Sequence, residues 1–246
     1  MKKILTLILT VLLTVSVPLS TAAATADVAT YIADLRQYYL EKDELTLVEE
    51  TLAMASMGML TGKTAFIPEK DGTALSLALR ILAYGAVGEL PEEETEQDEQ
   101  KSSEQSDTEQ RDTEQNDTEQ DNSDKTKKYT DANDLKEMQG ENGSFGDVET
   151  HCLAMMALSS RDVIYASTKA YEHLLTLQNE DGSFGESVKE TALAVCVLSF
   201  SKNDKETEAL AEALAYLVDY EADNAVDLSW KIIGITDGGM DANTVG

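Results

Sequence analysis

Asp147, His151 and Cys152 lie close together in the sequence and could together carry out chemistry. Carboxylate, imidazole and thiolate are the groups that bind zinc in proteins, and a zinc-bound thiolate is an activated nucleophile. His151 and Cys152 are consecutive in a predicted helix, however, so their side chains point about 100° apart. They do not converge on one ion, and we predict no metal site here.

The chain contains two cysteines, Cys152 and Cys196. This number excludes a disulfide framework, a four-cysteine zinc site and an iron–sulfur cluster. Two alternatives remain, a disulfide between the two or a pair of buried thiols. Both cysteines lie in apolar segments at non-equivalent positions, and the pattern favours buried thiols.

An internal repeat indicates which elements position these residues. The segment 135–146, LKEMQGENGSFG, returns 39 residues later as 174–185, LLTLQNEDGSFG. The apolar segments that follow, 149–159 and 189–199, align at an offset of 40 residues. A period of about 40 residues with two helices per unit is typical of an α/α repeat.

The two helices of each unit have different patterns. Residues 170–177 are amphipathic and are predicted to face solvent on one side. His173 falls on their polar side and is predicted to be solvated. Residues 191–200 are apolar or small nearly all round, which predicts a helix covered on most sides in an inner layer.

The loop between the two helices carries the motif Gln-x-x-x-Gly-Ser-Phe-Gly. Its glycines allow backbone conformations that other residues rarely adopt, and its phenylalanine is predicted to fill the gap between helices. Gln178 and Asp181 are predicted to hydrogen-bond amides or carbonyls at helix ends. The predicted motif residues are Gln139, Gly143, Phe145 and Gly146 in the first copy and Gln178, Asp181, Gly182, Phe184 and Gly185 in the second.

This unit resembles the repeat of the α/α-toroid superfamily of terpenoid cyclases and protein prenyltransferases, in which Gln-x-x-Asp-Gly-Ser-Phe/Trp-Gly joins an outer helix to an inner one. The resemblance is specific over residues 129–200 and looser elsewhere. It implies an all-α fold, an α/α toroid built from paired repeats of about 40 residues. The patterns predict about nine helices, whereas the closed barrel of six pairs that the resemblance implies needs twelve. We therefore expect a partial or truncated toroid, either open or continued beyond Gly246.

The same resemblance indicates which catalytic motifs to look for. Hopene-type cyclases carry an Asp-x-Asp-Asp acid motif, and the nearest string here, Asp131-Ala-Asn-Asp134, lacks the central acid. Asp131 is better explained as the N-cap of an outer helix. The zinc ligands of protein prenyltransferases are incomplete, and the Gly-Cys-Gly-Glu-Gln motif of thioester proteins is absent. No catalytic, cofactor-binding or metal-binding residue is predicted, and no cofactor.

Acidic residues dominate the charge of the 246-residue chain, which is −28. Nucleic acid is therefore excluded as a partner, because phosphate binding needs a basic surface. Residues 91–124 hold 15 acidic and two basic side chains, a net charge of −13. The wider segment 91–128 has no Ala, Val, Ile, Leu, Met, Cys or aromatic residue. With nothing apolar to bury, it is predicted to be a disordered low-complexity insert between helical regions 27–90 and 129–246.

Residues 1–26 are predicted to be a signal peptide. Met1-Lys2-Lys3 is followed by the apolar run 4–17, which is too short for a comfortable membrane span, and then by small residues that fit a cleavage site. The mature chain is therefore expected to be secreted or on the cell surface, with no membrane-spanning segment.

Together these patterns predict a secreted or cell-surface, non-catalytic α/α-toroid module that binds a ligand or a protein. The expected partner is a hydrophobic small molecule or a surface protein. The alternative is a terpenoid cyclase or prenyltransferase-like enzyme whose catalytic part is missing or lies beyond residue 246. An acid motif in further sequence would favour this enzyme.

Overall fold

The structure, a computed structural model, describes residues 28–42, 44–56, 58–60, 64–88 and 130–240. Within these ranges every regular element is an α-helix and there is no β-strand, as predicted. The predicted signal peptide, residues 1–26, and the predicted acidic insert, residues 91–128, lie outside the described residues.

The described ranges contain nine helices, the number predicted. The helices at Ser167–Leu175 and Val188–Leu198 differ by a few residues from the predicted segments 170–177 and 191–200, and the second begins earlier because the Ser187 side chain caps it. The helices are α2 (Val28–Glu41), α3 (Val48–Ser56), α4 (Ala74–Val87), α6 (Thr130–Glu137), α7 (Val148–Ser160), α8 (Ser167–Leu175), α9 (Val188–Leu198), α10 (Asp204–Asp219) and α11 (Ala225–Asp237).

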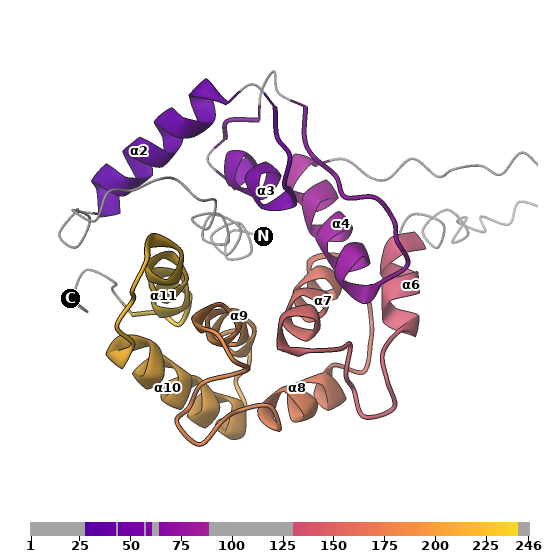
Figure 1. Cartoon of the computed structure of the whole chain (residues 1–246). Coiled ribbons are helices and arrows are strands. Elements are labelled where there is room, and N and C mark those ends of the chain that lie inside the picture. Colours follow the sequence, from indigo (N-terminus) through magenta and orange to yellow (C-terminus); the bar gives the residue numbers. More distant parts are fainter. Residues whose placement is uncertain (1–27, 43, 57, 61–63, 89–129, 241–246) are drawn as a thin grey trace, which may run out of the picture.

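The C-terminal helices lie in two layers along an arc (Figure 1). Helices α7, α9 and α11 lie on the inner side of the arc, and α6, α8 and α10 lie on the outer side. Helix α4 contacts α7 and continues the inner layer, in which α7 contacts α9 and α9 contacts α11. Outer helix α6 contacts both α4 and α7, and α10 contacts both α9 and α11. Helices α6 and α10 therefore each cover the groove between two neighbouring helices of the inner layer.

Inner helices α7 and α9 are buried because their sequences are apolar or small on nearly all sides. Every residue from His151 to Leu158 and from Thr191 to Leu198 is buried. The prediction of a covered inner helix is confirmed for these residues. It is wrong for Phe200, which is 43 % exposed, because α9 ends at Leu198 and the chain turns towards the surface there.

Outer helices α8 and α10 each bury one stripe. On α8 the buried residues are Ala170 and Leu174. On α10 the buried apolar residues are Ala209, Ala213 and Leu217. Residues four positions apart lie on the same face of a helix, so these side chains attach the outer helices to the inner layer.

Side-chain caps determine where the inner helices begin. Asp147 accepts a hydrogen bond from the amide of Thr150 at the start of α7, and Ser187 accepts one from the amide of Glu190 at the start of α9. Each cap satisfies an amide that no carbonyl of its own helix can reach. The first buried turn of each inner helix therefore follows directly after its loop.

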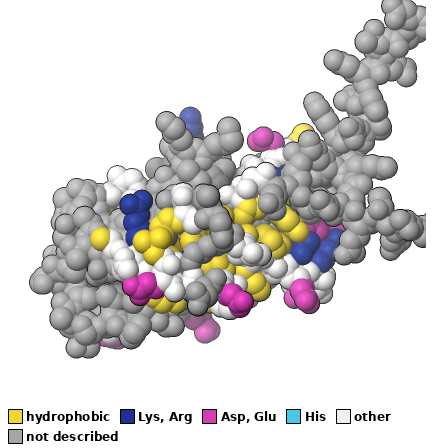
Figure 2. All heavy atoms as spheres, turned by 90° about the horizontal axis from the view of Figure 1, so that it is seen from above, with side chains coloured by type: hydrophobic (Ala, Val, Ile, Leu, Met, Phe, Trp, Pro, Cys, Tyr) yellow, Lys and Arg dark blue, Asp and Glu magenta, His cyan; other side chains and the backbone are white. Residues whose placement is uncertain are grey.

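One face of the described surface has an apolar area at its centre (Figure 2). Figure 2 shows hydrophobic side chains gathered in the middle of the face seen from above, with acidic side chains along its lower edge. This is the side on which α3 and α4 lie in Figure 1. Leu47, just before α3, and Phe66, in the connection from α3 to α4, are exposed. The acidity of the chain is therefore not spread evenly over the described surface.

Candidate functional site

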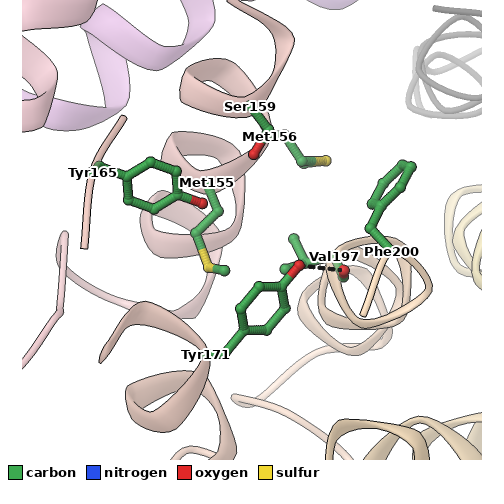
Figure 3. A pocket seen from close by; sticks show the side chains of 7 residues that line it. All are labelled: Met155, Met156, Ser159, Tyr165, Tyr171, Val197 and Phe200. Atoms are coloured by element: carbon green, nitrogen blue, oxygen red, sulfur yellow. Dashed lines mark hydrogen bonds between the residues drawn. The ribbon is translucent and has the colours of Figure 1, made fainter. Parts of the chain in front are cut away.

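A pocket of about 220 Å³ lies among α7, α8 and α9. The side chains around it are thioether, aromatic, aliphatic and hydroxyl groups (Figure 3). None of them carries a formal charge at neutral pH. The lining residues are Met155, Met156, Ser159, Tyr165, Tyr171, Val197 and Phe200.

Different elements supply the walls of this pocket. Met155 and Met156 belong to α7, and Val197 belongs to α9. Tyr171 belongs to α8, and its hydroxyl donates a hydrogen bond of 3.3 Å to the carbonyl oxygen of Val197 (Figure 3). This bond joins the outer helix to the inner one beside the pocket and holds the Tyr171 ring in place.

No group in the lining ionises near neutral pH. Burial, together with the neighbouring Tyr165 and Glu206 side chains, raises the pKa of Tyr171 to about 12. Burial also raises the pKa of Tyr165. The hydroxyl of Ser159 has no base in the lining that could activate it as a nucleophile. The pocket is therefore suited to holding an apolar molecule rather than to acid–base chemistry.

The glutamines of the two motif loops connect each loop to the next outer helix. Gln178 Nε2 donates to the carbonyl oxygen of Gly182 at 3.2 Å and to that of Ala209 at 3.0 Å. Gln139 makes the matching pair of bonds, to its own loop and to Ala166 just before α8. Gln139 thus contacts the residue just before α8. The predicted contact of Gln178 with a helix end is wrong, because Ala209 lies inside α10.

Asp181 stays within its own loop. Its Oδ1 accepts hydrogen bonds from the amide of Ser183 at 3.0 Å and from the hydroxyl of Ser183 at 2.6 Å. Asn142 Oδ1 accepts the equivalent bond from the amide of Ser144 in the first loop. The predicted contact between Asp181 and a helix end is wrong, because an Asp side chain readily reaches the amide two residues further along a turn.

Gly143 and Gly182 allow the loops to touch the outer helices. Their φ angles are 91° and 85°, in the left-handed region. A Cβ at Gly182 would lie 2.6 Å from the carbonyl oxygen of Glu212 on α10, and a Cβ at Gly143 would overlap the carbonyl of Lys169 on α8. Both positions therefore need glycine for two reasons, conformation and space. The motif glycines Gly146 and Gly185 also have positive φ.

The two motif phenylalanines are buried and bonded in the same way. Phe184 is 0 % exposed, and its amide donates to Thr191 Oγ1 at 3.0 Å. The amide of Phe145 donates to His151 Nδ1 at 3.2 Å. His151 on α7 and Thr191 on α9 thus each accept a hydrogen bond from the amide of a motif phenylalanine. Because Nδ1 accepts, the ring proton is on Nε2, which lies 3.0 Å from the Ala170 carbonyl oxygen.

His173 packs against this arrangement from α8. Its ring meets the His151 ring edge to face, with centroids 5.1 Å apart. His173 is half-buried, so the prediction that it is solvated is wrong, because α8 turns this position towards α7. The pKa of His151 is lowered from 6.5 to about 4, chiefly by burial, which outweighs the raising effect of the Ala170 carbonyl and is supported by nearby His173.

This depressed pKa predicts a loss of stability in acid. The unfolded chain takes up a proton on His151 near pH 6.5, whereas the folded chain resists protonation down to about pH 4. The stabilisation is complete above pH 6.5 and decreases as the pH falls towards 4, by about 3 kcal/mol. We expect urea titrations to show this loss as a difference between the wild type and a His151→Thr variant.

Threonine is the matched replacement, because Thr191 fills the equivalent position. Subtracting the variant from the wild type removes the contribution of the many carboxylates, which both chains share. A difference in unfolding free energy that stays constant between about pH 7 and pH 4 would contradict a neutral, buried His151.

The grouping of Asp147, His151 and Cys152 does not form a metal site in the structure. Asp147 accepts from the amide of Thr150 at 2.8 Å, and the Thr150 hydroxyl together with this amide lowers the pKa of Asp147. His151 is bonded to the backbone through both nitrogens, and Cys152 is fully buried. No group of three or more His, Cys, Asp or Glu side chains in the described part of the chain could hold a metal ion.

Both cysteines are free and buried, so the prediction of buried thiols is confirmed. Burial raises the pKa of each thiol. The Cys196 thiol donates to Asp237 Oδ2 at 3.2 Å, and burial raises the pKa of this carboxyl as well. Because both pKa values are raised, neither sulfur is a reactive thiolate at neutral pH.

Asp131 is an ion-pair partner rather than a helix cap. It is the second residue of α6, and its carboxylate lies 3.0 Å from Arg80 Nε and 3.2 Å from Lys70 Nζ. The predicted N-cap is therefore wrong, because α6 begins before Asp131 and the half-buried Arg80 on α4 pairs with its carboxylate. Asp134, the other acid of that string, lies 2.6 Å from Lys70 Nζ.

The residues that line the pocket do not form a sequence motif. Tyr165 lies between two helices, Tyr171 in the middle of α8, and Phe200 after α9, at no common spacing. The pair Met155 and Met156 was the available signal, because adjacent flexible side chains in an apolar helix are suited to an adaptable surface.

Comparisons of the chain with protein-family models, with curated proteins and with solved structures find no match. Among the described residues, no helix has both the length and the apolar character that crossing a membrane requires. The function must therefore be argued from the site itself.

Proposed function

We propose that the chain is a secreted or cell-surface, non-catalytic α/α-toroid module that binds an apolar small molecule. The observation that carries this proposal is the uncharged pocket of about 220 Å³ among α7, α8 and α9. The two-layer arc of helices supports the toroid arrangement (Figure 1). The matching hydrogen bonds of the two motif loops support a repeated unit.

The chemistry of the lining favours binding over catalysis. Small-molecule sites are typically concave, mostly apolar and provided with a few polar groups that orient the ligand. Here the aromatic side chains of Tyr165, Tyr171 and Phe200 supply flat apolar walls, and Met155 and Met156 adapt to the shape of the occupant. The hydroxyls of Ser159 and the tyrosines supply the few polar contacts.

A neutral fluorescent probe tests the proposal. N-phenyl-1-naphthylamine, which is dark in water and bright in apolar sites, should bind the folded chain saturably at one site. Ser159→Trp places an indole at an exposed position of the lining and should weaken binding at least about tenfold, or about 1.4 kcal/mol. The measurement is a fluorescence titration with excitation outside the tryptophan band.

The matched control is Thr168→Trp. Thr168 is an exposed residue of α8 that does not line the pocket. Binding of the probe to this variant should equal binding to the wild type. Equal affinity in both variants, or no saturable binding to the wild type, would show that the pocket is not a ligand site.

A further inference from the structure

Three aromatic rings stand on different sides of the pocket (Figure 3). Tyr165 comes from the connection between α7 and α8, Tyr171 from α8, and Phe200 from the residues after α9. The thioether of Met155 lies between the two tyrosines in the same view. Aromatic faces carry partial negative charge and sulfur is polarisable, so this lining is richer in electrons than an aliphatic one.

A buried carboxylate acts on one wall of the pocket, Tyr171. Glu206 is buried in the first turn of α10, and Asn203 Nδ2 donates to its Oε1 at 3.3 Å. The charge of Glu206 acts on Tyr171, where it adds to burial in raising the pKa of the phenol. The whole chain has a net charge of −28, which raises the local concentration of cations around it.

No basic side chain belongs to the lining to balance this field. Arg161, at the end of α7, donates to the carbonyl oxygen of Ile81 on α4. Lys169, on α8, donates to the carbonyl oxygen of Glu141 in the first motif loop. Lys202, two residues after Phe200, is exposed. An anionic ligand would therefore meet no basic side chain in the lining of the pocket.

We infer that the pocket binds an organic cation, an ammonium group on an apolar body, between the rings of Tyr165, Tyr171 and Phe200. This inference rests on the proposed function and specifies the ligand class of the same site. A quaternary ammonium group suits these walls, because it interacts with aromatic faces and needs no hydrogen-bond acceptor. The apolar body fills the part of the pocket lined by Met156 and Val197.

A pair of ligands with the same shape isolates the charge. Trimethylphenylammonium and its uncharged carbon analogue, tert-butylbenzene, each compete with N-phenyl-1-naphthylamine for the wild-type chain. The cation should displace the probe at a concentration at least about tenfold lower than the analogue does. A cation over aromatic faces gains binding free energy that corresponds to about this factor. This preference should shrink as salt is added, because part of it comes from screened charges.

Two variants distinguish the contribution of the aromatic rings from that of charge near the pocket. Phe200→Leu removes one ring and keeps an apolar side chain; Phe200 is 43 % exposed, so the fold tolerates the change. The affinity for the cation should fall about threefold or more, with the affinity for the analogue unchanged. Ser159→Lys places a positive charge at the rim and should repel the cation only, with Ser159→Met as its uncharged control.

The outcomes distinguish this inference from the proposed function. If the probe binds but the analogue competes as well as the cation, the pocket is a neutral apolar site and the inference is wrong. The same conclusion follows if the probe binds and neither ligand displaces it, or if Phe200→Leu leaves the preference intact. If the probe itself does not bind, the proposed function fails and the inference fails with it.

Discussion

Replacing Phe184 with alanine should destabilise the chain by about 3–5 kcal/mol, the usual cost of emptying a buried aromatic site. Phe184 is 0 % exposed and belongs to the hydrophobic core, so removing its ring leaves a buried cavity. The loop is held on both sides of the ring. The amide of Phe184 donates to the Thr191 hydroxyl at 3.0 Å, and that hydroxyl donates to the Phe184 carbonyl at 3.2 Å. The measurement is the free energy of unfolding from urea titration followed by circular dichroism.

Phe200→Ala is the control for this change. It removes the same side chain from a position that is 43 % exposed, and should cost about 1 kcal/mol or less. Phe145→Ala, in the first motif loop, should resemble Phe184→Ala, because its ring is 6 % exposed and its amide is bonded to the same position of the next helix. A loss under about 1 kcal/mol for Phe184→Ala would show that the ring does not support the helices as argued.

Much of the helical architecture could be predicted from the sequence because it depends on local pattern. The all-round apolar segment beginning at Thr191 and the one-sided pattern around Leu174 determine which helix is covered and which faces solvent. The motif glycines were also predictable, since a glycine before Ser-Phe marks a turn that other residues rarely adopt. Gly182, with a φ of 85°, has this conformation.

The tertiary contacts were not predictable in the same way. The contact of Gln178 with Ala209 depends on how closely α10 approaches the loop. The packing of Gly182 against Glu212 allows this close approach. His151 and Thr191 look unrelated as residue types, although both accept the amide of a motif phenylalanine. Nothing in the local pattern indicates that an imidazole and a hydroxyl accept equivalent hydrogen bonds.

The pocket could not be predicted from the sequence because its walls meet only after folding. Tyr171 occupies the half-buried side of α8, and its bond to the Val197 carbonyl joins residues 26 positions apart. Asp131 and Arg80 are 51 positions apart and are separated by the predicted insert. The residues around Asp131 therefore suggest an acid catalyst or a helix cap. They do not indicate that Asp131 forms an ion pair with Arg80.

Removing the Asp131 carboxylate should cost about as much as removing the Phe184 ring. The Asp131 side chain is 8 % exposed and that of Arg80 is 16 % exposed, so the pair is shielded from solvent. Asp131→Ala leaves the guanidinium partly buried, with the carbonyl oxygen of Pro68 at 2.7 Å and the ring of Tyr84 at 5.5 Å as its contacts. Breaking one side of a buried pair costs about 3–5 kcal/mol, mostly because a charge is left without its partner.

Asp134 provides the matched control for Asp131, because both aspartates lie on α6 and both contact Lys70. The Asp134 side chain is 43 % exposed, so Asp134→Ala should cost about 1 kcal/mol or less. The double variant Asp131→Leu with Arg80→Met removes both charges and should recover much of the loss, since a buried pair and an apolar pair are often similar in stability. If the two single aspartate variants lose the same small amount, Asp131 is a solvated charge. If the double variant is less stable than Asp131→Ala, the arginine stabilises the joint between α4 and α6 through its contacts with Pro68 and Tyr84 rather than through the ion pair.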